Sequence, residues 1–212
     1  MSVSAAFGVA TSDQFPKELK STSFKNHIAI NIVLAKGQWE KEEIFKRFEK
    51  ARKIYQNCDV DLIINKFIEF DWKFPTKGLF YDLSDDFKDR YEDGAQQFLV
   101  DLNLSKKPLV IFFDSFDEYI NKIATSFPRE STSKDSLVVN TAWITNKVND
   151  ANYKEKEPDS YSVLAHELGH ILLNEGHNLG FEPNLMHYKI EMLSDKLTDK
   201  QCLKIKNGIK HI

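Results

Sequence analysis

Residues 165–177 read Ala-His-Glu-Leu-Gly-His-Ile-Leu-Leu-Asn-Glu-Gly-His and contain the pattern His-Glu-x-x-His. Four residues turn an α-helix by about 400°, so His166 and His170 lie about 40° apart on one helical face. Both imidazoles can then bind one zinc ion. Glu167 is rotated by about 100° from His166, where its carboxylate can take a proton from water and pass it to a leaving amine. The pattern therefore predicts a catalytic zinc site on a helix.

The apolar residues around this pattern fall on the opposite face of the same helix. At 100° per residue they form one stripe directed away from the histidines. Its members are Leu164, Leu168, Ile171 and Leu172. This stripe can anchor the helix in a core while the other face presents metal ligands. A third histidine, His177, follows the predicted helix and is the expected third ligand.

With these residues the chain resembles a metzincin, the zinc metallopeptidase clan that includes astacins, serralysins and matrix metalloproteinases. The family pattern is His-Glu-x-x-His-x-x-Gly-x-x-His, followed downstream by a Met-turn. Residues 184–186, Asn-Leu-Met, resemble that turn. The resemblance implies that Met186 forms a hydrophobic floor beneath the metal. Met186-His187-Tyr188 resembles the astacin form, in which the tyrosine at the position of Tyr188 ligates zinc at rest and swings away to stabilise the tetrahedral intermediate.

The chain departs from the family pattern by one residue. The family's glycine falls at Leu173, its third histidine falls at Gly176, and His177 comes one residue late. The helix must end at a left-handed residue to turn the chain back, and Asn174 or Gly176 can adopt that conformation at little cost. A longer connection is therefore feasible. Three other residues remain alternatives to His177 as third ligand: Glu175, Glu182 and His187.

Patterning along the rest of the chain predicts a mixed α/β (α+β) domain with a five-stranded sheet. The expected strands are residues 27–34, 60–67, 108–113, 122–127 and 136–143. The expected helices are 39–57, 84–102 with a possible interruption at Gly94, one opening at 158–160 with Asp159 or Ser160 as cap, and one after a capping box of Thr198 and Gln201. This order matches metzincins, which place two long helices in the N-terminal lobe and follow the active-site helix with the Met-turn and a C-terminal helix.

The same sequence patterns predict the domain organisation. Residues 1–26 are expected to be an irregular lead-in, and 27–212 a single metallopeptidase domain with an N-terminal lobe over 27–176 and a C-terminal lobe over 177–212. The 212 residues, 42% of them hydrophobic, suffice for one sizeable core. A net charge of −3 argues against a nucleic-acid partner, and no apolar run reaches the length of a membrane span.

Two cysteines exclude Cys-based zinc sites and disulfide-dense miniproteins, and leave either one disulfide or two free thiols. The resemblance implies that Cys58, after the first long helix, and Cys202, at the start of the last one, both lie away from the cleft, where a disulfide is favoured. A disulfide would indicate a compartment outside a reducing cytosol. No intact signal peptide is visible, although a secreted protein without its leader would look the same. We expect a secreted or periplasmic protein.

The residues and the resemblance together predict a zinc-dependent endopeptidase. Zn²⁺ would be held by His166, His170 and His177 and would polarise the scissile carbonyl. Glu167 would act as general base and then general acid, and Tyr188 would assist the oxyanion. A peptide or protein substrate would add in extended form to the edge strand Ile123–Phe127 of a monomeric enzyme.

Two other classes of function fit the same residues. The first is a non-catalytic zinc module that binds a peptide, which the retention of Glu167 argues against because structural zinc needs no base. The second is a toxin or effector protease with one dedicated target. Its chemistry would be the same, and cleavage of a single partner rather than of broad substrates would identify it.

Overall fold

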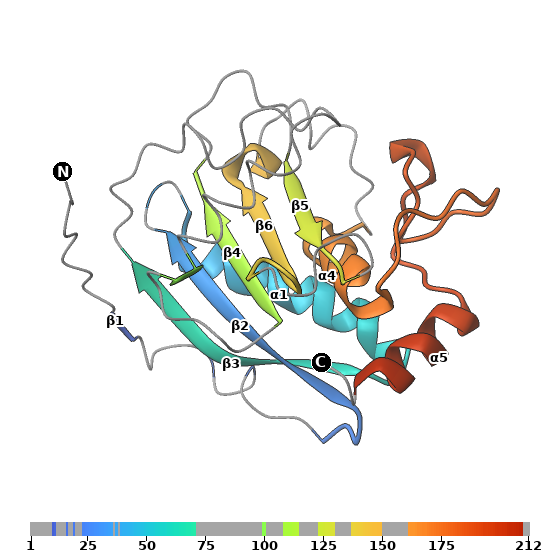
Figure 1. Ribbon diagram of the computed structural model, residues 1–212, viewed down its shortest axis with the longest axis horizontal. Coiled ribbons are helices and arrows are strands. Elements are labelled where there is room, and N and C mark those ends of the chain that lie inside the picture. The colour runs from blue at the N-terminus through green and yellow to red at the C-terminus, as the bar shows by residue number, and fades with distance from the viewer. Residues whose placement is uncertain are drawn as a thin grey trace.

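The structure is a computed structural model. It describes residues 10–11, 16, 19, 23–35, 37, 39–70, 99–100, 108–114, 123–129, 137–149 and 161–209. A six-stranded mixed sheet is its frame (Figure 1). The strands are β1 Ala10–Thr11, β2 His27–Ala35, β3 Asp61–Phe70, β4 Leu109–Phe113, β5 Ala124–Phe127 and β6 Thr141–Thr145. Their order in the sheet is β1-β3-β2-β4-β6-β5.

The four central strands are parallel, and an antiparallel strand lies at each edge. β2 pairs in parallel with β3 and β4, and β4 pairs in parallel with β6. β1 runs antiparallel to β3, and β5 runs antiparallel to β6. Among the described strands, β5 is therefore the terminal strand on the side of the sheet that lies next to the candidate site (Figure 1).

The described residues include the α-helices α1 Lys41–Gln56, α4 Val163–Leu173 and α5 Asp199–Gly208. Among the described connections, Asn146–Asn149 and Ile190–Met192 form short 3₁₀ helices. α1 and α4 pack on one face of the sheet (Figure 1). In the described part of the chain, no helix is long and apolar enough to cross a membrane.

Both faces of the sheet are buried at its centre, where every residue of β4 and β6 is buried. Alternate residues of β2, such as Ile30 and Ile32, join α1 and α4 in the main core, whereas Val33 belongs to a second cluster on the opposite face with Trp143. Strands buried on both sides carry nearly continuous apolar runs, which explains why 109–113 reads Leu-Val-Ile-Phe-Phe. The main core holds α4 against the sheet and so fixes the helix that carries the His-Glu-x-x-His pattern.

Most of the predicted strands and helices that fall on described residues are confirmed to within a few residues. The strand predicted over 60–67 continues to Phe70. The first long helix is α1, and the C-terminal helix α5 begins with the predicted capping box of Thr198 and Gln201. The helix predicted over 84–102 lies almost wholly outside the described residues, of which 99 and 100 are helical.

Three local predictions differ from the structure. The strand predicted over 136–143 begins only at Thr141, because residues 137–140 form a turn that ends at Asn140 with φ 60°. The active-site helix is capped by Ser162 rather than by Asp159 or Ser160, since the Ser162 hydroxyl accepts a hydrogen bond from the Ala165 N–H at 3.2 Å. Residues 10 and 11, within the expected irregular lead-in, pair with β3.

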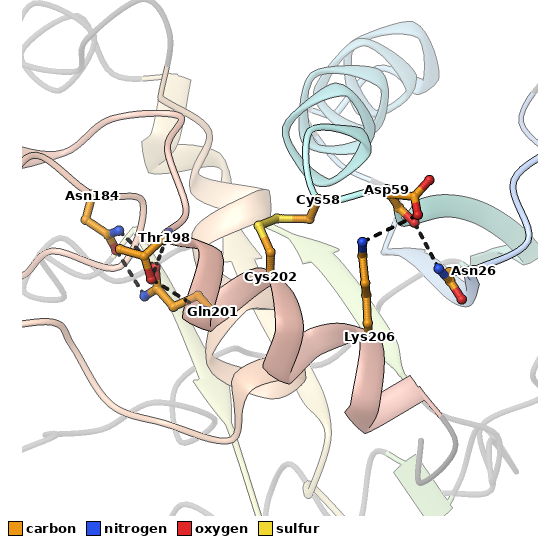
Figure 2. Close-up of a disulfide and its surroundings, with 8 residues drawn as sticks. All are labelled: Asn26, Cys58, Asp59, Asn184, Thr198, Gln201, Cys202 and Lys206. Atoms are coloured by element: carbon orange, nitrogen blue, oxygen red, sulfur yellow. Dashed lines mark hydrogen bonds and ion pairs between the residues drawn. A yellow bond between two sulfur atoms is a disulfide. The ribbon is translucent and has the colours of Figure 1, made fainter.

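A disulfide joins Cys58, just after α1, to Cys202 in the first turn of α5 (Figure 2). It confirms the favoured alternative for the two cysteines and spans a sequence separation of 144 residues. Asp59 extends this junction, because its carboxylate lies 3.4 Å from Lys206 Nζ and its carbonyl accepts a hydrogen bond from Asn26 at 3.3 Å. α5 is thereby fixed to the end of α1.

Candidate metal centre

The helix α4 is completely buried, so its position is set by packing along its whole length. The Tyr55 hydroxyl of α1 donates a hydrogen bond of 2.7 Å to the Ala165 carbonyl, one residue before the first histidine of the pattern. Tyr55 is fully buried, and burial raises its pKa far above the ordinary value for a tyrosine. The phenol therefore stays protonated and keeps donating.

The structure brings three histidine side chains together. His166, His170 and His177 each direct one ring nitrogen to a common point, and these atoms lie within 4.8 Å of one another. The Nε2 atom of His166 is 3.1 Å from that of His170 and 3.2 Å from that of His177. Two ligands on a tetrahedral zinc at about 2.0–2.1 Å would be roughly 3.3 Å apart. The separations therefore fit a Zn²⁺ ion bound by three imidazoles.

Hydrogen bonds at the other ring nitrogens fix how two of these imidazoles are protonated. His166 Nδ1 lies 2.6 Å from the Leu185 carbonyl, and His170 Nδ1 lies 2.8 Å from the Glu175 carbonyl. A carbonyl only accepts, so each Nδ1 carries the hydrogen and each neutral ring presents a lone pair at Nε2. Lone pairs facing one another at 3.1 Å repel, and a cation between them removes that repulsion. The donor set therefore suits zinc.

The pKa values of the three imidazoles agree with this role. Burial lowers the pKa of His166 and of His170 below the usual histidine range, and burial followed by the charge of His166 lowers the pKa of His177. All three rings are thus held in the neutral form that binds metal.

The one-residue departure from the family spacing is absorbed by the helix. α4 continues through Leu173, and Asn174 then adopts the left-handed conformation with φ 52° and ψ 47°. Its N–H bonds to the His170 carbonyl, and Glu175 and Gly176 lead to His177. The left-handed residue thus precedes the third histidine by three positions, as the glycine of the metzincin pattern does. Helix termination by Asn174, one of the two predicted candidates, is confirmed.

Met186 lies directly against the helix beneath the histidines. It is 1% exposed, and a Cβ placed on Gly169 would collide with its Sδ atom and lie 3.1 Å from its Cε. Gly169, between the two histidines of the pattern, therefore allows the thioether to approach the helix backbone. The turn itself is held by Asn184, whose Oδ1 accepts a hydrogen bond from the Met186 N–H at 3.0 Å.

The three alternative ligands lie in other environments. His187 is buried, its Nε2–H donates to the Gly180 carbonyl at 2.9 Å, and its Nδ1 accepts from the Lys189 N–H at 3.0 Å. Both nitrogens are therefore used in holding the loop. Glu175 forms an ion pair with Lys204 on α5, and Glu182 is exposed. Among the described residues, only the three histidines form such a metal-binding group.

Glu167 and Tyr188 occupy different positions relative to the histidines. Glu167 is 8% exposed on α4 beside His166, and its charge acts on His170. Tyr188 is 53% exposed, its ring stacks on that of His187 at 5.1 Å, and Lys189 Nζ lies 5.6 Å from its centre. Glu167 thus lies on the helix that carries two of the histidines, close enough for its charge to act on His170, and Tyr188 is stacked on the adjoining loop.

Sequence reasoning missed a layer of residues behind the ligands. The Leu185 carbonyl orients His166, and Gln201 of α5 bonds to Asn184 through two amide contacts of 2.9 and 3.2 Å. The capping box at Thr198 and Gln201 was visible in the sequence as a local pattern. The hydrogen bonds between Gln201 and Asn184 leave no recognisable pattern in the sequence around either residue.

Comparison with solved structures finds a similar fold in archaemetzincin. The crystal structure of archaemetzincin from Methanopyrus kandleri superposes with a TM-score of 0.52 at 15% identity, covering 87% of this chain and 96% of that one. A zinc-dependent peptidase from Methanocorpusculum labreanum gives a TM-score of 0.49 at 12% identity, covering 83% and 99%. No protein-family model matches the chain, and no curated protein matches it. The chain has an archaemetzincin-like fold, which carries its three-histidine centre.

Proposed function

We propose that this protein is a zinc-dependent endopeptidase of metzincin type. The observation that carries the proposal is the convergence of three neutral imidazoles on one point, with a buried glutamate next to the first of them. The archaemetzincin-like fold supports the same assignment. The Met186 turn supports the metzincin subclass, because it places a thioether against the helix between the two histidines of the pattern.

In this proposal each residue has one role. His166, His170 and His177 hold the metal, and Met186 packs beneath their helix. Bound zinc supplies Lewis-acid polarisation of the scissile carbonyl and makes a water more acidic. Glu167 accepts the proton of the attacking water and delivers it to the leaving amine, as its position on α4 beside His166 allows.

We assign Tyr188 the role of oxyanion donor, by its resemblance to the astacin tyrosine. Its ring is half exposed and stacks on the ring of His187, and the proposed role requires the side chain to rotate from this position towards the metal. A phenol that donates to the developing oxyanion would lower the barrier without contributing to ground-state binding.

We further propose that substrate binds in extended form along β5. This strand is antiparallel to β6, ends the sheet among the described strands, and packs beside α4. An extended peptide adds to such an edge through main-chain hydrogen bonds. The Cys58–Cys202 disulfide supports a secreted or periplasmic location.

The test is metal content followed by cleavage of a peptide library. We expect about one zinc per chain, hydrolysis that is lost on treatment with a strong chelator, and recovery when stoichiometric Zn²⁺ is returned. A zinc-loaded protein that cleaves no peptide or protein substrate would contradict the proposal and favour the peptide-binding module. Cleavage of one partner alone would identify a dedicated effector protease.

A further inference from the structure

We propose that Gln201 of α5 is a positioning residue for the metal centre and acts through Asn184. The inference rests on the proposed zinc site, although not on peptidase activity. Gln201 is not part of the three-histidine group. It holds the turn that contains the hydrogen-bond partner of His166, and so it sets the orientation of the first ligand.

The contact consists of two carboxamides that bond to each other (Figure 2). Asn184 Nδ2 donates to Gln201 Oε1 at 2.9 Å, and Gln201 Nε2 donates to Asn184 Oδ1 at 3.2 Å. Each amide orientation is fixed by a backbone N–H that must face oxygen. The Met186 N–H points to Asn184 Oδ1 at 3.0 Å, and the Thr198 N–H points to Gln201 Oε1 at 2.8 Å.

The residue after Asn184 in this turn is the hydrogen-bond partner of His166, so the contact with Gln201 lies one residue away from the metal centre. Leu185 lies between Asn184 and Met186, and its carbonyl accepts the hydrogen bond from His166 Nδ1 at 2.6 Å. The N–H of Leu185 is held by the Lys196 carbonyl at 2.7 Å. A carbonyl that accepts the second ring N–H of a metal-binding histidine fixes the orientation of that ring. The loss of such a partner typically weakens metal binding about 10–100-fold.

The chemistry of the contact requires glutamine at position 201. A capping box needs only an acceptor at this position, and glutamate serves there as well as glutamine. Glutamate, however, has no hydrogen to donate to Asn184 Oδ1. Asn184 cannot compensate by turning its amide over, because its NH₂ group would then face the Met186 N–H. Asn184 is 2% exposed, so the second carboxylate oxygen of a glutamate would face the buried Asn184 Oδ1 at the place where Gln201 Nε2 now donates, and the two oxygens would repel each other.

α5 is a suitable anchor for this purpose because it is itself fixed. The disulfide of Cys202 joins its first turn to the end of α1, and Lys206 reaches Asp59 one helical turn further on (Figure 2). α1 in turn supports α4 through the hydrogen bond from Tyr55 to Ala165. The turn at Asn184–Met186 and the ligand helix α4 are therefore both anchored to α1 through these contacts.

The experiment compares Gln201→Glu with Thr198→Ala. The first keeps the acceptor of the capping box and replaces the Gln201 Nε2 donor of the amide pair by an oxygen, whereas the second removes the capping hydroxyl and leaves both bonds of the pair intact. Zinc affinity is measured by competition with a chromophoric chelator. The visible spectrum of Co²⁺-substituted protein reports the geometry of the ligands.

We expect Gln201→Glu to weaken zinc binding about tenfold, at the low end of the range for direct partners because it acts through Asn184, and to alter the cobalt spectrum. Thr198→Ala should stay within twofold of wild type with an unchanged spectrum. Gln201→Glu within twofold of wild type, or equal losses in both variants, would overturn the inference. Wild-type protein that binds zinc and cleaves no peptide would contradict the proposed function alone.

Discussion

Gly169 and Met186 are in such close contact that no side chain fits between them: a Cβ at residue 169 would collide with the Met186 sulfur. Met186 is 1% exposed, so its side chain is enclosed by protein. The glycine in the middle of His-Glu-x-x-His is therefore required by the turn that packs beneath it, although glycine costs about 1 kcal/mol in a helix relative to alanine.

Gly169→Ala should lower the free energy of unfolding by about 1–3 kcal/mol, the usual cost of overpacking, because the methyl group displaces Met186. Urea unfolding of the zinc-free protein measures this. Gly208→Ala is the matched control, since a Cβ at that helical position meets only the Leu172 carbonyl at 3.5 Å. The control should be neutral or stabilising, and equal losses at both glycines would contradict the close contact.

Tyr55 should make the stability depend on pH in the alkaline range. Its pKa in the folded protein lies far above the value of about 10 in the unfolded chain, because it is fully buried. Below pH 10 the phenol is protonated in both states. Above pH 10 only the unfolded state loses the proton, so stability falls by about 1.4 kcal/mol per pH unit.

The measurement is urea unfolding of zinc-free wild type and Tyr55→Phe between pH 8 and pH 11. The phenylalanine variant lacks the bond to Ala165 and should be about 1 kcal/mol less stable at pH 8. That difference should shrink above pH 10 and reverse by pH 11. A constant difference over the whole range would show that the tyrosine titrates equally in both states.

His177 is predicted to be the third zinc ligand. His177→Ala should lose most of the zinc affinity, because a catalytic site needs three protein ligands and two histidines of one helix remain. Glu175→Ala and Glu182→Ala should stay zinc-replete. His187→Ala should also keep the metal while it lowers stability, since both its nitrogens hold the loop. Metal analysis after gel filtration decides the assignment, and a zinc-replete His177→Ala protein would give the position to another residue.

Tyr188→Phe removes one hydroxyl and almost no volume. If the phenol donates to the oxyanion, kcat should fall about 10²–10³-fold with little change in KM. Steady-state kinetics on the best peptide of the library measure both constants. Tyr188 stacks on His187 in the structure, so an unchanged kcat would indicate that it only packs on the loop.

The parts of the fold that follow from local chemistry were predictable from the sequence. Apolar periodicity located the strands and α1, and the His-Glu-x-x-His spacing located the two helical ligands. The N-cap at Ser162 was missed because three neighbouring polar residues compete for the role and only packing selects one. The turn at 137–140 was missed because its residues are as apolar as a strand.

The candidate site was predictable only in its outline. Asn174 and Gly176 both tolerate the left-handed conformation, and the return of His177 to the metal centre decides between them. The Asn184–Gln201 pair joins two segments whose relative placement depends on α5, the disulfide and α1 together. A contact of that kind leaves no pattern within either segment.

The proposed function requires that Glu167 moves protons in a zinc peptidase and does not bind the metal. The most direct measurement is the rate of peptide cleavage by Glu167→Ala protein with its zinc content determined on the same sample, beside the exposed-glutamate control Glu182→Ala. We expect about one zinc per chain in both variants, with cleavage abolished in Glu167→Ala and retained in the control. Cleavage by zinc-loaded Glu167→Ala within tenfold of the wild-type rate would contradict it.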